Sequence, residues 1–187
     1  MDHAARMEYV RETLRRSAWH MATLRAVCEL DLPDWAIGAG FVRNLVWDRL
    51  HGFEAPTPLI DVDVLFFDRE NAGPAREREI EAALTRKAHR PWSVRNQARM
   101  HLGNGDRAYT STADAISFWL EIPSCVAVRL DAGETISVLA PLGLDDLFAL
   151  RIAPTARGRE RHAEYVERLT RKNWPRTWPR LVVDERT

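Results

Sequence analysis

Two aspartates, Asp61 and Asp63, stand inside an otherwise apolar stretch of the sequence, residues 59–67. Side chains of a β-strand alternate between its faces, so both carboxylates would share one face, roughly 6 to 7 Å apart at the backbone. They could then converge on one divalent metal ion, or on two ions about 4 Å apart. Without a metal, buried carboxylates need arginine partners or exposure at the end of the strand. The opposite face would carry four apolar side chains, those of Ile60, Val62, Val64 and Phe66.

A glycine-rich turn precedes this stretch. Residues 35–39 predict a short strand, and a helix is expected from about Phe41 to Leu50. Between them, the backbone at Ala39 and Gly40 can approach another group closely, because glycine accepts unusual conformations. A helix start also offers free N–H groups and a positive dipole end, which favour phosphate. An ordinary turn is the alternative, since the residues match neither a Walker loop nor G-x-G-x-x-G.

A second group of polar side chains lies in residues 92–100, which predict another strand. In an extended chain, one face would present a row of donors. That row is Arg95, Gln97, Arg99 and His101. It could bind phosphate, base or ribose oxygens, or it could be the solvated face of an edge strand.

The remaining pattern supplies the elements that would position these residues. It predicts an amphipathic helix at 5–30, helices at 75–87, 112–119, 142–152 and 156–172, and a hairpin of 125–130 with 135–140. Two Trp-Pro pairs should dock a C-terminal tail, 154–187, onto the body. Helices and strands in this order predict an α/β (α+β) fold, a small mixed sheet flanked by helices in a single domain, 1–187.

Composition limits the function classes. The chain carries 27 basic and 27 acidic residues, which argues against strong non-specific nucleic-acid binding. No apolar run is long enough for a membrane span, and the N-terminus is too charged for a secretory signal. The two cysteines lack metal-ligand spacing. We therefore expect a cytoplasmic protein. Residues 151–187 nevertheless hold ten basic against five acidic residues. That segment could face the acidic strand and receive a polyphosphate, or it could simply be a solvated helix face.

The order of these motifs resembles a known superfamily. Gly38-Ala39-Gly40-Phe41-Val42-Arg43-Asn44, followed by Asp61-Val62-Asp63-Val64, is similar to the signature of nucleotidyltransferases typified by DNA polymerase beta, and especially to the head of tRNA nucleotidyltransferases. Residues 39–48, 61–63, 96–101, 141–148 and 172–179 extend the likeness to a family of uncharacterised bacterial proteins assigned to that superfamily.

The resemblance implies a polymerase-beta-like fold and a metal-dependent reaction. Asp61 and Asp63 would bind Mg²⁺ (or Mn²⁺), and an NMP would pass from an NTP to the hydroxyl of an unknown acceptor, a small molecule, an RNA end or a protein. Substrate contacts would come from seven residues. They are Ala39, Gly40, Arg43, Asn44, Asn96, Arg99 and His101.

The third carboxylate departs from the superfamily pattern. Asn96 stands where an acid is expected, so Glu121 is the candidate for the catalytic position and Asp131 the second choice. Three hypotheses follow. The chain is an active nucleotidyltransferase, a catalytically degenerate nucleotide-binding or regulatory protein of the same fold, or a structural protein whose Asp61 and Asp63 are salt-bridged to Arg43 or Arg99.

Overall fold

A five-stranded mixed sheet forms the centre of the protein. The computed structural model describes residues 1–184. The strand order is β3-β2-β1-β4-β5, with β2 and β3 parallel and the other neighbours antiparallel. The strands are β1 (Ala36–Gly38), β2 (Val62–Phe66), β3 (Trp92–Asn96), β4 (Ala127–Leu130) and β5 (Ile136–Leu139). β6 (Arg151–Ile152) and β7 (Val182–Val183) pair in parallel as a second, small sheet.

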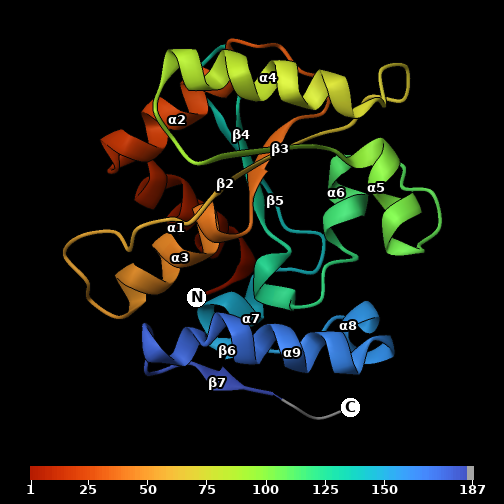
Figure 1. Ribbon diagram of the computed structural model, residues 1–187. Coiled ribbons are helices and arrows are strands. Elements are labelled where there is room, and N and C mark those ends of the chain that lie inside the picture. Colours follow the sequence, from red (N-terminus) through yellow and green to blue (C-terminus); the bar gives the residue numbers. More distant parts are fainter. Residues whose placement is uncertain (185–187) are drawn as a thin grey trace.

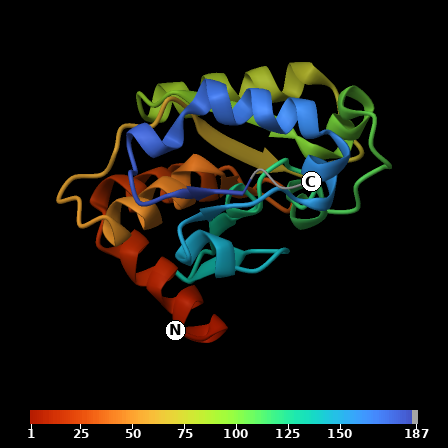
Figure 2. The same ribbon diagram turned by 90° about the horizontal axis from the view of Figure 1, so that it is seen from below.

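Helices surround the sheet (Figure 1). Figure 1 shows α4 on one side of the sheet, with α8, α9 and the β6–β7 pair on the opposite side. In the view from below, α8 and α9 form the part nearest the reader (Figure 2). The helices are α1 (His3–Arg15), α2 (Ala18–Cys28), α3 (Gly40–Leu50), α4 (Pro74–Lys87), α5 (Gln97–Asn104), α6 (Thr112–Ile116), α7 (Asp145–Phe148), α8 (Ala156–Glu160) and α9 (His162–Lys172), with the short 3₁₀ turns η1 (Ile122–Ser124) and η2 (Trp174–Arg176).

The two faces of the sheet have different roles. On β2, Val62, Val64 and Phe66 are buried in the main core, which they share with apolar side chains of α1 to α4. Asp63 and Leu65 point to the other face because strand side chains alternate. There Leu65 packs in a smaller cluster with Ile116 of α6. The less covered face of the sheet is therefore the one that carries the acidic residue.

The C-terminal segment is docked through its tryptophans, as predicted. Trp174 and Trp178 pack edge-on against Trp47 of α3, with ring centroids 6.0 and 5.2 Å apart. The Trp178 indole N–H also donates to Asp48 Oδ1 at 2.8 Å. This fixes the chain beyond α9 to the main body, while residues 185–187 lie outside the described part of the predicted tail.

Several predicted helices are shorter or interrupted. The helix expected at 5–30 is two helices, because Ser17 caps α2 and its hydroxyl contacts His20. Residues 142–152 hold only the single turn α7 before β6, and α6 ends at Ile116. The helix expected at 156–172 breaks at Arg161. No helix within residues 1–184 has the length and apolar character that a membrane crossing requires.

Two predicted strands also need correction. β2 begins only at Val62, so Ile60 is 81% exposed and does not join the apolar face. β3 ends at Asn96, whose side chain caps α5 by accepting from the Ala98 N–H at 3.1 Å. The chain is helical from Gln97 onward, so the predicted row of donors on one strand face does not form. The hairpin of β4 and β5, the helix α3 and the helix α4 are confirmed.

Candidate active site

The turn between β1 and α3 holds an unusual backbone conformation. Ala39 has φ 51° and ψ −120°, a region that side chains other than glycine seldom adopt. Its N–H donates to the Val126 carbonyl at 3.0 Å, and its carbonyl accepts from the Arg43 N–H at 2.9 Å. No side chain of residues 1–184 caps α3, so the first N–H groups of the helix remain for another acceptor. A Cβ at Gly40 would make only ordinary van der Waals contacts, at 3.5 Å with Asn44 and 3.6 Å with Leu59, so space alone does not require glycine here.

Asp63 is the less exposed of the two strand acids. It is half-buried on β2, whereas Asp61 is exposed just before the strand. Burial, and after it the charge of Asp61, raise the pKa of Asp63 to about 6, against the opposing effects of the Ser93 hydroxyl, Arg168 and Arg43. The electrostatic environment of Asp63 thus lacks enough positive charge to keep it as acidic as a free aspartate.

Glu121 is completely buried and lies at the same cleft. A β-bridge to Pro154 fixes its backbone, and Arg168 of α9 donates from Nε to its Oε1. Its other oxygen, Oε2, is buried without a hydrogen-bond partner in residues 1–184. Asp131, the second choice for a third carboxylate, instead accepts from the Thr135 N–H at 2.8 Å in the β4–β5 turn.

Two cavities meet at Asp63. We call them the helix-start cavity, about 320 Å³, and the arginine-rich cavity, about 330 Å³. Ala39, Asp63 and Arg168 line both. The helix-start cavity is further lined by Gly40, Arg43, Asn44, Thr57, Pro58, Leu59, Ile60, Asp61, Lys172, Trp174, Thr177 and Trp178. The arginine-rich cavity is further lined by Leu65, Arg95, Gln97, Met100, Asn104, Asp106, Phe118, Trp119, Leu120, Glu121, Arg157, Arg161 and Glu164.

Arg43 connects the elements that form the walls of the helix-start cavity. Its guanidinium donates to Ser124 Oγ at 2.6 Å and to Asn44 Oδ1 at 3.0 Å. It also stacks on the Trp174 ring, 4.4 Å from the centroid. Burial lowers the pKa of Arg43 to about 10, with nearby Glu121 acting in the opposite direction. Arg43 therefore links α3, η1 and the C-terminal segment while its charge stays near the acids.

Three predicted substrate contacts lie outside both cavities. Asn96 is buried, and its amide binds the backbone of Asp68 and Asn71. Arg99 forms a two-point ion pair with Glu77, at 2.9 and 2.5 Å. The His101 ring packs edge-on against the ring of Tyr109. Their side chains support the fold around β3 and α5 rather than facing the acids.

The structural hypothesis fails on its stated contacts. Within the described chain, neither Arg43 nor Arg99 forms an ion pair with Asp61 or Asp63, although the charge of Arg43 does act on Asp63. No three histidine, cysteine, aspartate or glutamate side chains of residues 1–184 form a ready-made metal cluster. The acids are thus neither neutralised by the expected arginines nor gathered into a complete metal cage.

Comparison with known proteins places this geometry in a family. A family described as nucleotidyltransferase matches residues 25–183. The chain belongs to this nucleotidyltransferase family. It is also similar to a structure whose title reads "The NMR structure of the protein reveals a CCA-adding enzyme head domain", with 31% identity, a TM-score of 0.82 and 95% of each chain covered. The mixed sheet flanked by helices is therefore a nucleotidyltransferase fold, as the sequence predicted.

Other comparisons add little to the family assignment. A structure titled "Structure of tRNA-processing enzyme complex 3" shares 16% identity over 70% of this chain and 35% of that one, with a TM-score of 0.45. A comparison with curated proteins found no match.

The candidate site also contains residues that the sequence did not single out. Arg168 lies between the two cavities, and Lys172, one turn further along α9, lines the helix-start cavity. The only sequence signal for them was the positive charge of residues 151–187. Ser93, the hydroxyl partner of Asp63, had no such signal, because its role depends on the pairing of β2 with β3.

Proposed function

We propose that the protein transfers a nucleoside monophosphate from an NTP to the hydroxyl of an acceptor, with Mg²⁺ (or Mn²⁺) held by Asp61 and Asp63. One observation carries this proposal. Asp63 lies where two cavities meet, with an uncapped helix start in one cavity and the buried acid Glu121 in the other. A donor and an acceptor could therefore approach the same carboxylate from opposite sides.

The available ligand atoms suit a hard divalent cation. Asp61 and Asp63 offer carboxylate oxygens, which Mg²⁺ prefers. The raised pKa of Asp63 and the unpartnered Oε2 of Glu121 show that negative charge here lacks compensation. One or two bound cations would supply that compensation, and would also neutralise charge developing on phosphate oxygens.

The residues of the helix-start cavity would hold the triphosphate. The first N–H groups of α3 can donate to phosphate oxygens, and Arg168 and Lys172 supply positive charge from α9. These contacts would orient the α-phosphate of the NTP toward Asp63. The acceptor oxygen would enter from the arginine-rich cavity and attack that phosphorus in line, forming a new P–O bond while pyrophosphate leaves. Glu121 would take up the acceptor's proton through Oε2, the oxygen that has no hydrogen-bond partner among residues 1–184.

Calorimetric titration tests the donor half of this proposal. Each of the four NTPs is titrated with and without Mg²⁺ into wild type and Asp61→Asn/Asp63→Asn. We expect one or more NTPs to bind only with Mg²⁺, and the double variant to bind at least tenfold more weakly. The matched control is Asp31→Asn/Glu70→Gln, which removes two exposed charges elsewhere. Absence of NTP binding under both conditions would refute the proposal.

A second function has support from Glu121. Its Oε1 is bound by Arg168, and no complete metal cluster exists in the described residues, as expected of a degenerate nucleotide sensor. Release of pyrophosphate distinguishes the two functions. A sensor would bind NTP and Mg²⁺ without releasing pyrophosphate in the presence of any hydroxyl acceptor, whereas a transferase releases one pyrophosphate for each acceptor consumed.

A further inference from the structure

The charges that line the arginine-rich cavity are largely matched with one another. Three of its four arginines form ion pairs with acids of the same cavity. Arg157 contacts Asp106 at 2.5 Å, Arg161 contacts Glu164 at 3.2 Å, and Arg168 contacts Glu121. The fourth arginine, Arg95, forms no ion pair with any residue from 1 to 184; its guanidinium donates to the Val94 carbonyl at 2.7 Å. The cavity therefore has one exposed cation that is not ion-paired.

Strand register places Arg95 on the same face of the sheet as Asp63. In the parallel pair of β2 and β3, Asp63 lies opposite Ser93, and Leu65 lies opposite Arg95. Arg95 is thus one strand across and two residues along from Asp63, which is roughly 8 Å between Cα atoms. A small ligand can place one group at Arg95 and another at Asp63.

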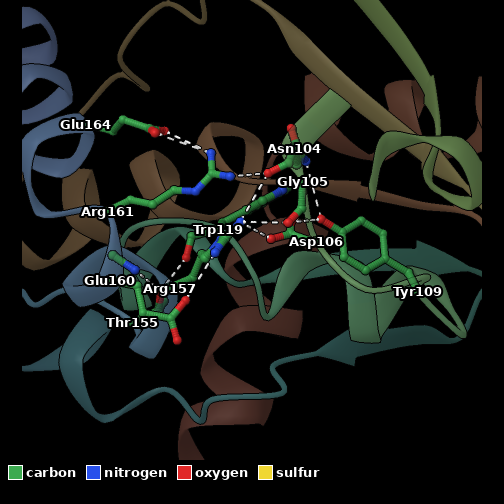
Figure 3. A network of polar contacts seen from close by, with 11 residues as sticks. Asn104, Gly105, Asp106, Tyr109, Trp119, Thr155, Arg157, Glu160, Arg161 and Glu164 are labelled. Carbon is green, nitrogen blue, oxygen red and sulfur yellow. Dashed lines mark hydrogen bonds and ion pairs between the residues drawn. The ribbon is translucent and has the colours of Figure 1, made fainter. Parts of the chain in front are cut away.

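The wall opposite the sheet is fixed by a polar network (Figure 3). Figure 3 shows Arg157 of α8 and Arg161, at the junction of α8 and α9, pointing toward Asn104 at the end of α5. Arg157 donates to the Asn104 carbonyl at 3.1 Å, and Arg161 donates to the same oxygen. Both arginines thus use donors on ion pairs and on this carbonyl to hold the wall. Among the four arginines of the cavity, Arg95 is the one whose charge is not committed to a described acid.

Aromatic and apolar groups complete the cavity. Trp119 packs so tightly over β1 that a Cβ at Gly38 would lie 3.0 Å from its ring. Phe118, Leu120 and Met100 add further apolar surface. A cavity of about 330 Å³ is at the small end of ligand sites, which suits a compact molecule.

We infer that the arginine-rich cavity binds the acceptor, and that the acceptor is a small hydroxyl compound carrying a phosphate or carboxylate group. This inference rests on the proposed function. The anionic group contacts Arg95, and the hydroxyl points toward Asp63 and Glu121. An RNA end fits less well, because binding a nucleic-acid backbone takes several cations free to contact phosphates, and Arg157 and Arg161 of this cavity already hold its wall through ion pairs and backbone contacts.

Matched small probes test the charge requirement. Glycerol 3-phosphate, glycerate and glycerol share a short hydroxylated chain and differ in the anionic group; ribose 5-phosphate and ribose repeat the comparison with a larger molecule. Each is titrated calorimetrically into the full chain. We expect millimolar or tighter binding of at least one anionic probe, and at least tenfold weaker binding of its neutral counterpart. A tenfold change corresponds to about 1.4 kcal/mol.

Variants assign the binding to this cavity. Arg95→Gln should weaken the anionic probe at least tenfold, whereas Arg78→Gln makes the same charge change on the exposed face of α4 and should have no effect. Met100→Trp should fill the cavity and abolish probe binding without altering NTP binding. Lys172→Gln should weaken NTP binding and leave probe binding unchanged, since Lys172 lines only the helix-start cavity.

The outcomes separate this inference from the proposed function. If NTP binds with Mg²⁺ but anionic and neutral probes bind equally, or Arg95→Gln binds like wild type, the acceptor inference is overturned and the transferase proposal stands. If an RNA trinucleotide binds through Arg95 and no small anion does, the acceptor class is wrong. If the anions bind but no NTP does, the proposed function fails and with it the assignment of this cavity to an acceptor.

Discussion

Replacing Asp63 by asparagine should stabilise the metal-free protein at neutral and alkaline pH. The pKa of Asp63 is raised from 3.8 to about 6, chiefly by burial. Between these two values the native protein holds a proton that the unfolded chain has released. The free energy of unfolding therefore falls as pH rises through that window, and the full cost of the charge is present above about pH 6. Asparagine has nearly the same shape and carries no charge.

The size of the effect follows from the pKa shift. A rise of about two units in the pKa of Asp63 corresponds to roughly 3 kcal/mol less free energy of unfolding at high pH. This is an upper limit, because the Asp63 side chain is only half-buried. We expect Asp63→Asn to raise the free energy of unfolding by about 2 kcal/mol at pH 8 and by almost nothing at pH 4. For a chain of this length, that is a rise in melting temperature of roughly 4 to 8 °C.

Urea unfolding followed by circular dichroism, with a chelator present, measures the change at pH 4, 5, 6, 7 and 8. Asp31→Asn is the control, since it removes an exposed aspartate with the same chemistry. Addition of Mg²⁺ should then stabilise wild type but not Asp63→Asn. The reasoning would be refuted by a variant that is no more stable than wild type at pH 8, or by a stabilisation that is equal at pH 4 and pH 8.

Further substitutions probe the supporting contacts. Arg168→Gln should destabilise by about 3 kcal/mol because it breaks the ion pair of the buried Glu121 side chain, and Arg168→Gln/Glu121→Gln should recover most of that loss in urea unfolding. Gly158→Ala would place a Cβ 2.2 Å from the Leu120 carbonyl oxygen, so we expect a loss of more than about 2 kcal/mol, or an insoluble protein, whereas a neutral melting temperature would contradict this packing. Trp178→Phe should lower the free energy of unfolding by about 1 to 3 kcal/mol, because the buried Asp48 Oδ1 loses the indole N–H donor. An unchanged urea midpoint would contradict a stabilising role for this hydrogen bond.

The sequence predicts local elements well where one periodicity dominates. The strand at β2, the helix at α3 and the β4–β5 hairpin follow from alternation, a glycine turn and a tight loop. The prediction fails where a side chain interrupts a continuous pattern. Ser17 divides the first helix by capping the second, and the Asn96 amide starts α5 where alternation would have continued the strand.

The candidate site was predicted only in part, for a related reason. Asp63 and the turn at Ala39 could be placed because each belongs to a local strand–turn–helix pattern. Glu121 lines the same cavity as Asp63, and its role as the third carboxylate stays a prediction. The partner Arg168 could not be assigned, because it lies 47 residues later and only the packing of α9 brings it to that acid. Pairings of this range depend on tertiary structure, which one sequence does not reveal.

The long separation of Glu121 and Arg168 has a consequence for synthesis on the ribosome. The five strands of the central sheet are complete by Leu139, so much of the fold can form while α9 is still inside the exit tunnel. During that interval Glu121 lacks Arg168, the arginine that donates to it, and a buried carboxyl group short of its donor opposes closure of the cleft. The nascent protein should therefore stay open around its acids until the last quarter of the chain emerges. The candidate site would then be assembled only after translation of α9.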